Sequence, residues 1–226
     1  MRVLRSTFAK ASHAMLLSHQ YQFIFIKTRK TAGTSVEVEL SKLMGPDDIV
    51  TPITPPEDGH VPRNFQVRNP LHLLRRERYY NHVPARTVRK LAGRRTFDRY
   101  FKFCVDREPV SKCLSMYKML SSDTSFEKYD AALTWDEYVD RGRFPVDDQI
   151  YLDSDGSLLV DRVLRYEQLG EELAAVTGQL GLGFERLSAQ AKGGLRQATP
   201  VTVTEAQRRR IYDIFAPTLR YTGYTI

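Results

Sequence analysis

The sequence is poor in cysteine and contains no long hydrophobic run. Its two cysteines, Cys104 and Cys113, are too few for a disulfide framework, and their spacing does not match a zinc site. We therefore expect a reducing compartment and no metal. No apolar run reaches the roughly 18 to 20 residues that a membrane-spanning helix needs, so we also expect no membrane span. The pattern G-x-x-x-x-G-K-[ST] is missing, which excludes a Walker nucleotide loop.

The first twenty residues have neither the apolar core nor the cleavage site of a secretory signal. We therefore expect a cytoplasmic protein. The same stretch is free of acidic residues and contains Arg2, Arg5 and Lys10, so a mitochondrial-type presequence is the alternative.

The composition indicates a folded, basic protein. Its 226 residues fit one domain, and 42% hydrophobic with 11% aromatic residues rules out global disorder. The formal net charge of +7 favours anionic partners. Residues 60–102 hold twelve basic and two acidic residues, a local net charge of +10, so the remainder of the chain is slightly acidic. Three histidines, His60, His72 and His82, lie in the same segment.

Two strand–loop–helix units stand out along the chain. The first has an apolar strand at 21–26, a cationic loop at 27–35 and a helix at 36–44. The second has a strand at 101–105 and a helix that starts at Pro109. Because strands alternate with helices, we predict an α/β domain whose central β-sheet is mainly parallel and flanked by helices.

Further elements are expected on either side of these units. We predict helices near 70–80, 84–92, 135–139 and 171–180, and a strand at 162–166. The turn at 153–156 indicates a hairpin between 149–152 and 158–160. Thr204 and Gln207 form the pattern of a capping box, and we expect Pro217 to end the helix that follows.

The loop at 27–35 has the residue types that bind phosphate. A loop that leaves a strand and enters a helix directs backbone N–H groups and the positive end of the helix dipole at its ligand. Ala32 and Gly33 permit close approach, Thr34 and Ser35 add hydroxyl donors, and Lys30 adds a charge. The alternative is an ordinary strand–helix turn with surface lysines.

The run Phe-Ile-Phe-Ile-Lys-Thr-Arg-Lys-Thr-Ala-Gly-Thr-Ser (23–35) resembles the 5′-phosphosulfate loop of sulfotransferases that use 3′-phosphoadenosine 5′-phosphosulfate (PAPS). In this family a hydrophobic strand often precedes Lys-Thr-[Ala/Gly]-Gly-Thr-Ser. The resemblance implies that PAPS is bound by Lys30, Thr31, Ala32, Gly33, Thr34 and Ser35. Arg29 stands where many members have proline, and Lys27 where many have histidine.

The second unit resembles the 3′-phosphate motif of the same family, an arginine followed by x-Pro and by a serine eight positions on. Here these residues are Arg107 and Ser115. An arginine at the end of a strand can bind phosphate through two N–H groups, and a serine two turns into the helix can add a hydroxyl. Asp106, beside the arginine, is a departure from the family and would partly neutralise it.

Three C-terminal segments extend the resemblance to about residues 20–226. Residues 163–169 resemble the family's Arg-[Phe/Tyr]-Glu-x-Leu segment, and 214–224 resemble its terminal Tyr-Ala-x-Asp…Phe-Gly-Tyr signature. Lys192, Gly193 and Arg196 resemble the basic glycine loop that returns to the 3′-phosphate. The match is closest to the branch that includes carbohydrate 2-O-sulfotransferases and bacterial sulfotransferase family 2 proteins.

The catalytic assignment follows from the same resemblance. Tyr-Tyr-Asn-His-Val-Pro-Ala (79–85) resembles the segment in which this branch has its catalytic histidine, so His82 is the expected base; a helix-capping surface histidine is the alternative. Histidine suits the role because its ordinary pKa lies near neutral pH. Lys30 would stabilise charge on the leaving group. His60 and His72 are lesser candidates, and His60 is expected to be solvent-exposed.

The resemblance implies a single P-loop-like sulfotransferase domain over 1–226, with 1–19 as an N-terminal extension and 46–100 as an acceptor-side insertion. The enzyme would move the sulfuryl group of PAPS to a hydroxyl of an acceptor, such as an anionic glycan, a lipid or a secondary metabolite, without a metal. We expect no nucleic-acid partner, and the oligomeric state stays open. The alternatives are a kinase-like phosphotransferase and, less favoured, a non-catalytic module that binds polyanions or nucleic acid through 60–102.

Overall fold

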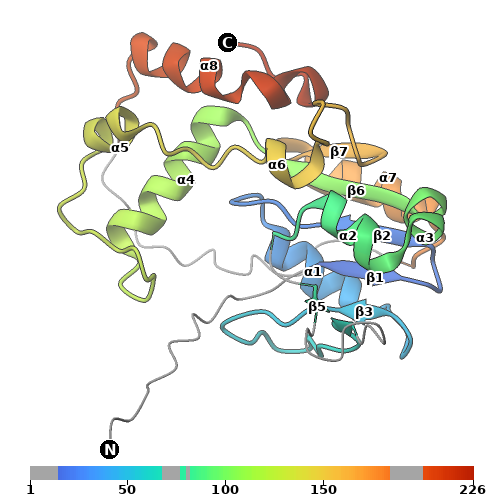
Figure 1. The fold of residues 1–226 in the computed structure, drawn as a ribbon. Coiled ribbons are helices and arrows are strands. Elements are labelled where there is room, and N and C mark those ends of the chain that lie inside the picture. The colour runs from blue at the N-terminus through green and yellow to red at the C-terminus, as the bar shows by residue number, and fades with distance from the viewer. Residues whose placement is uncertain (1–14, 68–76, 80–81, 184–200) are drawn as a thin grey trace, which may run out of the picture.

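The computed structural model describes residues 15–67, 77–79, 82–183 and 201–226 (Figure 1). Its main sheet has the strand order β3-β1-β2-β6-β7. The strands of this sheet are β1 (Leu16–Ser18), β2 (Phe23–Ile26), β3 (Ile49–Val50), β6 (Phe101–Asp106) and β7 (Arg162–Arg165). A second, two-stranded sheet pairs β4 (Gln66–Val67) with β5 (Glu77–Arg78).

Eight α-helices flank or extend the main sheet within the described ranges. They are α1 (Gly33–Ser41), α2 (Ala85–Ala92), α3 (Arg94–Arg99), α4 (Pro109–Ser122), α5 (Trp135–Arg141), α6 (Asp148–Tyr151), α7 (Leu169–Gln179) and α8 (Glu205–Thr222). A 3₁₀ turn, η1 (Tyr166–Gln168), joins β7 to α7. In the part of the chain that the structure describes, none of these helices has the length and hydropathy needed to cross a bilayer.

The main sheet is mixed rather than mainly parallel. β2 pairs in parallel with β6, and β6 in parallel with β7, as the two strand–loop–helix units require. β1 pairs antiparallel with both β2 and β3. Only four residues separate β1 from β2, and such a short connection permits only antiparallel pairing. The α/β class is therefore confirmed, and the expectation of a mainly parallel sheet is corrected at the β1 edge.

Alternate residues of β2 enter two different cores because successive side chains of a strand point to opposite faces. Ile24 and Ile26 pack in a cluster with Val88 of α2 and with α6 residues. Phe23 and Phe25 pack on the other face with residues of α1 and α7. The sheet is thus covered on both faces, which is the layered arrangement that an α/β domain needs to bury both sides of its central strands.

A third cluster joins α4, α5 and α8 beyond the edge of the sheet (Figure 1). Trp135 and Tyr138 of α5 stack with ring centroids 5.5 Å apart, and both lie beside Tyr117 of α4. Ile211 and Phe215 of α8 complete the cluster. This packing fixes α4, whose first turn follows directly from the end of β6.

Several local predictions need correction. Residues 148–151 form α6 instead of a hairpin strand, although Leu152 and Leu158 still make an isolated antiparallel bridge. The capping box of Thr204 and Gln207 is confirmed, but Pro217 lies inside α8, which continues to Thr222. The helix expected near 70–80 lies largely outside the described residues, and its end at 77–78 is strand β5.

Candidate functional site

The loop of residues 27–32 leaves the carboxyl end of β2 and lies beside the end of β6. Because β2 and β6 are parallel neighbours, their carboxyl ends meet at the same edge of the sheet. The Thr28 hydroxyl donates to the backbone carbonyl of Val105 near the end of β6, and Thr28 also contacts the Thr31 hydroxyl at 2.8 Å. The loop after β2 is therefore joined by a direct hydrogen bond to the end of β6, the strand that leads to Arg107.

The loop curls because two of its residues adopt left-handed backbone conformations. Lys30 has φ 61° and Ala32 has φ 56°, on either side of Thr31. Ala32 precedes α1 and provides no side-chain cap, so the first N–H groups of α1 open onto the loop. Such an arrangement of N–H groups suits an anion. The hydroxyl of Thr31 is engaged within the loop by the Thr28 hydroxyl and carbonyl.

Gly33 is required by the packing of the loop rather than by its backbone angles. A Cβ atom at this position would lie 2.7 Å from Cγ of Lys27. Lys27 is buried and its Nζ lies 3.1 Å from Oε2 of Glu37 in α1. A glycine therefore lets the start of α1 rest against the side chain of Lys27. Thr34 is half-buried and Ser35 is buried at the same end of α1.

Arg107 lies next to this loop. Its Nε donates to the Ser111 hydroxyl at 2.8 Å, and its guanidinium donates to the Lys30 carbonyl at 3.4 Å. The guanidinium also lies 4.1 Å from the ring centroid of Tyr166. Among the described residues no carboxylate forms an ion pair with Arg107, so its positive charge faces the loop without a counter-ion.

One face of α4 extends from Arg107 to Lys30. Ser111, Ser115 and Met119 are spaced four residues apart and share this face. Ser111 contacts Arg107, and Sδ of Met119 lies 3.4 Å from Nζ of Lys30. Ser115 is half-buried one turn from each of these contacts. The structure thus brings Lys30 and Arg107 into contact, and Ser115 lies on the α4 face between Ser111 and Met119.

His82 contacts the same loop at Lys27. Its Nδ1 lies 3.0 Å from the backbone carbonyl of Lys27, so this nitrogen donates and Nε2 is left as the acceptor. The residue adopts a left-handed conformation, φ 52°. Desolvation, opposed by the charge of Asp147 and by the hydrogen bond to Lys27, lowers the pKa of His82 to about 4. At neutral pH the imidazole is therefore uncharged.

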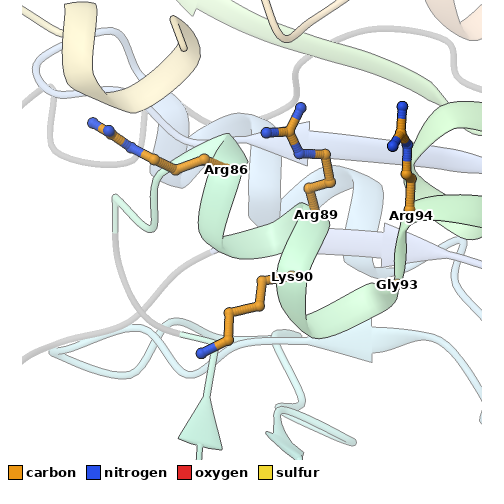
Figure 2. Close-up of a pocket in the computed structure, with 5 residues that line it drawn as sticks. All are labelled: Arg86, Arg89, Lys90, Gly93 and Arg94. Carbon is orange, nitrogen blue, oxygen red and sulfur yellow. The ribbon is translucent and has the colours of Figure 1, made fainter. Parts of the chain in front are cut away.

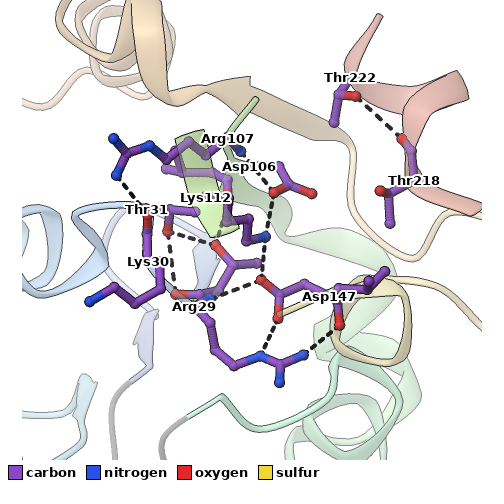
Figure 3. Close-up of polar contacts among 12 residues, drawn as sticks. Arg29, Lys30, Thr31, Asp106, Arg107, Lys112, Asp147, Thr218 and Thr222 are labelled. Carbon is purple, nitrogen blue, oxygen red and sulfur yellow. Dashed lines mark hydrogen bonds and ion pairs between the residues drawn. The ribbon is translucent and has the colours of Figure 1, made fainter. Parts of the chain in front are cut away.

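A buried network of charged side chains lies beneath the loop (Figure 3). Nζ of Lys112 in α4 lies 2.5 Å from Asp106 and 2.7 Å from Asp147, and all three side chains are buried. Burial opposes the charge of Lys112, but the two carboxylates outweigh it and raise its pKa. The Tyr151 hydroxyl donates to the second oxygen of Asp106 at 2.7 Å. Asp106 therefore faces inward; its Oδ1 also accepts from the backbone N–H of Arg107 at 2.8 Å, and among the described residues its carboxylate makes no ion pair with the Arg107 guanidinium.

Asp147 connects this network to the loop. It accepts hydrogen bonds from the backbone N–H and from Nε of Arg29, at 2.9 and 2.7 Å, and the Arg29 guanidinium also donates to the Val146 carbonyl. Burial by itself would raise the pKa of Asp147, but Lys112 and Arg29 hold it below its ordinary value. The residue before Lys30 is thus held at both its backbone and its side chain.

His60 is buried, contrary to the expectation that it is exposed to solvent. Its Nε2 lies 3.6 Å from Oε1 of Glu37 in α1. Glu37 also accepts from the Thr51 hydroxyl at 3.2 Å and from Lys27. These contacts make His60 part of the support of α1. The proline-rich sequence around His60 does not predict its contact with Glu37, which is distant in sequence.

Some residues lie outside the site as described. Lys192, Gly193, Arg196 and His72 fall outside the described residues. Conversely, Lys112 and Asp147 contact the site residues and were not singled out from the sequence, whereas Tyr166, which lies against Arg107, belongs to the segment 163–169 that was. Asp147 is 118 residues from Arg29, and no local sequence pattern predicts that they pair. For Lys112, its place on the α4 turn after Arg107 was the one available signal.

Comparisons with known proteins give little further information. No family model matches the chain, and no solved structure matches it. The chain is 30% identical, over 115 residues, to an uncharacterized protein of Archaeoglobus fulgidus. This match covers 46% of the present chain and 86% of the archaeal protein, so the two are similar over about half of this chain.

Proposed function

We propose that the protein is a sulfotransferase that moves the sulfuryl group of PAPS to a hydroxyl of a carbohydrate, lipid or other small-molecule acceptor. The observation that supports this most is the convergence of three separate segments. The loop at 27–35, Arg107 with Ser115, and His82 lie around the carboxyl ends of β2 and β6. Ligands of open α/β sheets bind at this end of parallel strands.

The cationic groups suit a donor with two separated anionic ends. Lys30 and the N–H groups at the start of α1 would hold the 5′-phosphosulfate, and Arg107 with Ser115 would hold the 3′-phosphate. Arg107 is suited to this role because its partners Ser111, Tyr166 and the Lys30 carbonyl orient it without neutralising it. PAPS would supply an activated sulfuryl group, whose bond to the 5′-phosphate oxygen breaks as the acceptor oxygen bonds to sulfur.

His82 would accept the acceptor's proton. The hydrogen bond from its Nδ1 to Lys27 fixes the tautomer, and Nε2 carries the free lone pair. A pKa of about 4 keeps that lone pair unprotonated at neutral pH. A bound polyanion would favour the protonated form, so the basicity of His82 rises when the donor site is filled. Lys30 would stabilise the charge that develops on the leaving phosphate oxygen.

The kinase-like alternative loses its one candidate for a magnesium ligand. Asp106 is the acidic residue closest to the phosphate-binding loop after a strand. Both of its oxygens are engaged by buried partners, Lys112 and Tyr151. A carboxylate that neutralises a buried lysine is not available to a cation without breaking that pair. Competition between Mg²⁺–ATP and PAPS for the purified protein separates the two functions.

The test uses two variants with different expected losses. His82→Ala should abolish sulfuryl transfer yet bind the desulfated product 3′-phosphoadenosine 5′-phosphate (PAP) with near-normal affinity. Arg107→Ala should weaken PAP binding by roughly tenfold or more, because it removes charge-assisted hydrogen bonds. His19→Ala, an exposed histidine that contacts Tyr100, is the matched control for the first variant. The function is excluded if PAP does not bind the wild-type protein, and the base assignment is wrong if His82→Ala retains normal turnover.

A further inference from the structure

Glu37, in the second turn of α1, carries a buried carboxylate that contacts the loop at 27–32. Its Oε2 lies 3.1 Å from Nζ of Lys27, and both side chains are more than nine-tenths buried. Its Oε1 lies 3.2 Å from the Thr51 hydroxyl, which also contacts Met15 beside β1. His60 approaches the same oxygen at 3.6 Å, beyond hydrogen-bonding distance. Lys27 is therefore the cation that Glu37 binds.

The side chain of Lys27 extends along one face of α1. Gly33 and Glu37 are four residues apart and share this face. A Cβ atom at position 33 would lie 2.7 Å from Cγ of Lys27 and 3.2 Å from its Cε. The stem of the lysine thus packs against the glycine while its ammonium group contacts the glutamate. The first turn of α1 therefore rests on a side chain that is held at its far end.

The backbone of Lys27 contacts the proposed base. Lys27 is the first residue after β2, and the pairing of β2 with β6 ends at Ile26. The Lys27 carbonyl accepts a hydrogen bond from Nδ1 of His82 at 3.0 Å. Because this bond sets the tautomer of the ring, the direction of the carbonyl decides which nitrogen of His82 carries the proton. Lys27 thus contacts the start of α1 through its side chain and His82 through its carbonyl.

The fixed position of Lys27 distinguishes it from cations at the surface. The cations at the junction of α2 and α3 surround a surface pocket and are Arg86, Arg89, Lys90 and Arg94. Figure 2 shows that their side chains point in different directions, with Lys90 turned away from the arginines. The Lys27 ammonium group instead faces one buried carboxylate. A cation held in this way fixes the position of the groups around it.

The stability of the fold does not by itself require a charged pair at this place. Two ions that leave water lose their hydration, and well-packed apolar side chains often replace a buried ion pair without loss of stability. Apolar side chains, however, do not fix a direction as a charge-assisted hydrogen bond does. The pair of Lys27 and Glu37 is therefore best explained by the geometry that it imposes on the loop.

We infer that Glu37 is a positioning residue of the proposed site, which acts through Lys27 to fix the start of α1 and the ring of His82 relative to each other. The contacts above carry the positioning itself, but its use in sulfuryl transfer rests on the proposed function. A donor held at α1 and a base held by Lys27 need a fixed separation. A misplacement of about 1 Å can slow such a transfer by roughly 100-fold.

The test compares a broken pair, a replaced pair and an unrelated loss of stability. Glu37→Gln breaks the pair, and Lys27→Met/Glu37→Gln removes both charges but keeps an unbranched side chain at position 27. Leu133→Ala, a buried residue of the third cluster just before α5, is the control. Stability is measured by urea denaturation and PAP affinity by calorimetry. Long-range ¹H–¹⁵N NMR spectra at neutral pH report the tautomer of His82, and the spectrum of His82→Gln identifies its signals.

We expect wild-type His82 to carry its proton on Nδ1 alone. Both tautomers should be present in Glu37→Gln and in the double variant, and PAP affinity should fall by roughly threefold or more as the start of α1 shifts. The urea midpoint should fall by about 1 M in Glu37→Gln and in Leu133→Ala, whereas the double variant should recover most of this loss. Leu133→Ala should keep the wild-type tautomer and PAP affinity.

Two results would overturn the inference. If the double variant regains the wild-type tautomer together with its stability, the pair of Lys27 and Glu37 serves the fold alone. If Leu133→Ala shows the same mixture of tautomers as Glu37→Gln, the effect is a general loosening of the protein. The double variant supplies the same readouts if Glu37→Gln does not fold.

The NMR and PAP measurements separate this inference from the proposed function. If wild type binds PAP but His82 keeps one tautomer in both Glu37 variants, the positioning inference fails alone. If wild type does not bind PAP and the tautomer changes as expected, the sulfotransferase function fails and the link from Glu37 to His82 remains.

Discussion

Two cationic regions of this protein differ in how their charges are balanced. Around the loop at 27–32, Lys112 and Asp147 are buried and paired at 2.7 Å. At the junction of α2 and α3, Arg94 is 89% exposed and its pair with Asp98 is 3.4 Å long. The first region uses charge to fix the shape of a loop, and the second presents charge to solvent. A count of basic residues in the sequence therefore does not distinguish a structural cation from one that is available to a ligand.

The difference has an energetic basis. A buried pair is costly to form because both ions leave water, but removal of one partner leaves the other charged and buried. An exposed pair keeps most of its hydration, so its loss changes little. Substitutions in the two regions should therefore differ in effect by several kcal/mol, although each removes one charge.

The largest effect is expected for Lys112→Met. The methionine fills similar space but leaves Asp106 and Asp147 buried without their shared cation, with Arg29 as the remaining partner of Asp147. We expect the free energy of unfolding to fall by about 3 to 5 kcal/mol, measured by urea denaturation. Lys118→Met, on the same helix and half-buried, is the matched control and should stay within about 0.5 kcal/mol. Similar losses for the two variants would remove the distinction between buried and available cations.

Arg29→Ala should have the next largest effect, and it acts on the loop itself. The substitution removes the Nε bond to Asp147 and the bond to the Val146 carbonyl but keeps the backbone N–H bond. We expect a loss of about 2 kcal/mol in unfolding free energy, discounted for the partial exposure of Arg29. We also expect weaker PAP binding, because Lys30 is no longer held in its left-handed conformation.

Arg29→Lys sharpens the same comparison. A lysine keeps the charge, but its donors sit on a single nitrogen, so it cannot reproduce the planar, forked hydrogen bonding of the guanidinium group. If positioning by the fork matters, Arg29→Lys should bind PAP less tightly than wild type, although its net charge is the same. Unchanged PAP affinity in both variants would show that the Asp147 contact serves stability alone.

Most of the central elements could be predicted because their signals are local. The apolar runs of β2 and β6, Pro109 at the start of α4 and the capping box before α8 each lie within a few residues. β1 was missed because three residues are too few to show a strand pattern. Pro217 was expected to end α8, but packing of α8 in the third cluster, on both sides of this residue, outweighs the lost hydrogen bond.

The candidate site was partly predictable for the same reason. Lys30, Arg107 and Ser115 belong to motifs with fixed spacing, and the parallel pairing of β2 with β6 brings those motifs together. The inward direction of Asp106 depends on Lys112 of α4 and on Tyr151 and Asp147, which belong to α6 and its N-cap. Long-range pairs of this kind have no local sequence pattern, so the support beneath the loop emerged only from the fold.

His82 lies between the two cationic regions. Its expected effect on the free energy of unfolding is smaller than that of Arg29 and larger than that of the exposed pair. Its pKa is lowered from 6.5 to about 4 in the folded state, so the unfolded chain takes up the proton first. The contribution of His82 to the free energy of unfolding is therefore fully present above pH 6.5, and it falls as the pH decreases toward 4. At pH 5 we expect a loss of about 1 kcal/mol from this residue, after allowance for its half-buried position.

Urea unfolding of wild type and His82→Gln at pH 7 and pH 5 measures this contribution. The glutamine amide can still donate to the Lys27 carbonyl but has no proton to take up, so the variant should lose less stability between the two pH values. His19→Gln is the control at an exposed histidine. Equal pH dependence in wild type and His82→Gln would contradict the lowered pKa.

The smallest effect is expected for Asp98→Asn in the exposed region. Arg94 begins α3 and Asp98 lies near its end, so both charges oppose the helix dipole and their pair contributes little. We expect the free energy of unfolding, measured by urea denaturation, to change by less than about 0.5 kcal/mol, because the pair is exposed and hydrated. A loss of more than about 1 kcal/mol would mean that the exposed pair holds the α2–α3 turn together. The two cationic regions would then differ in degree of burial but not in purpose.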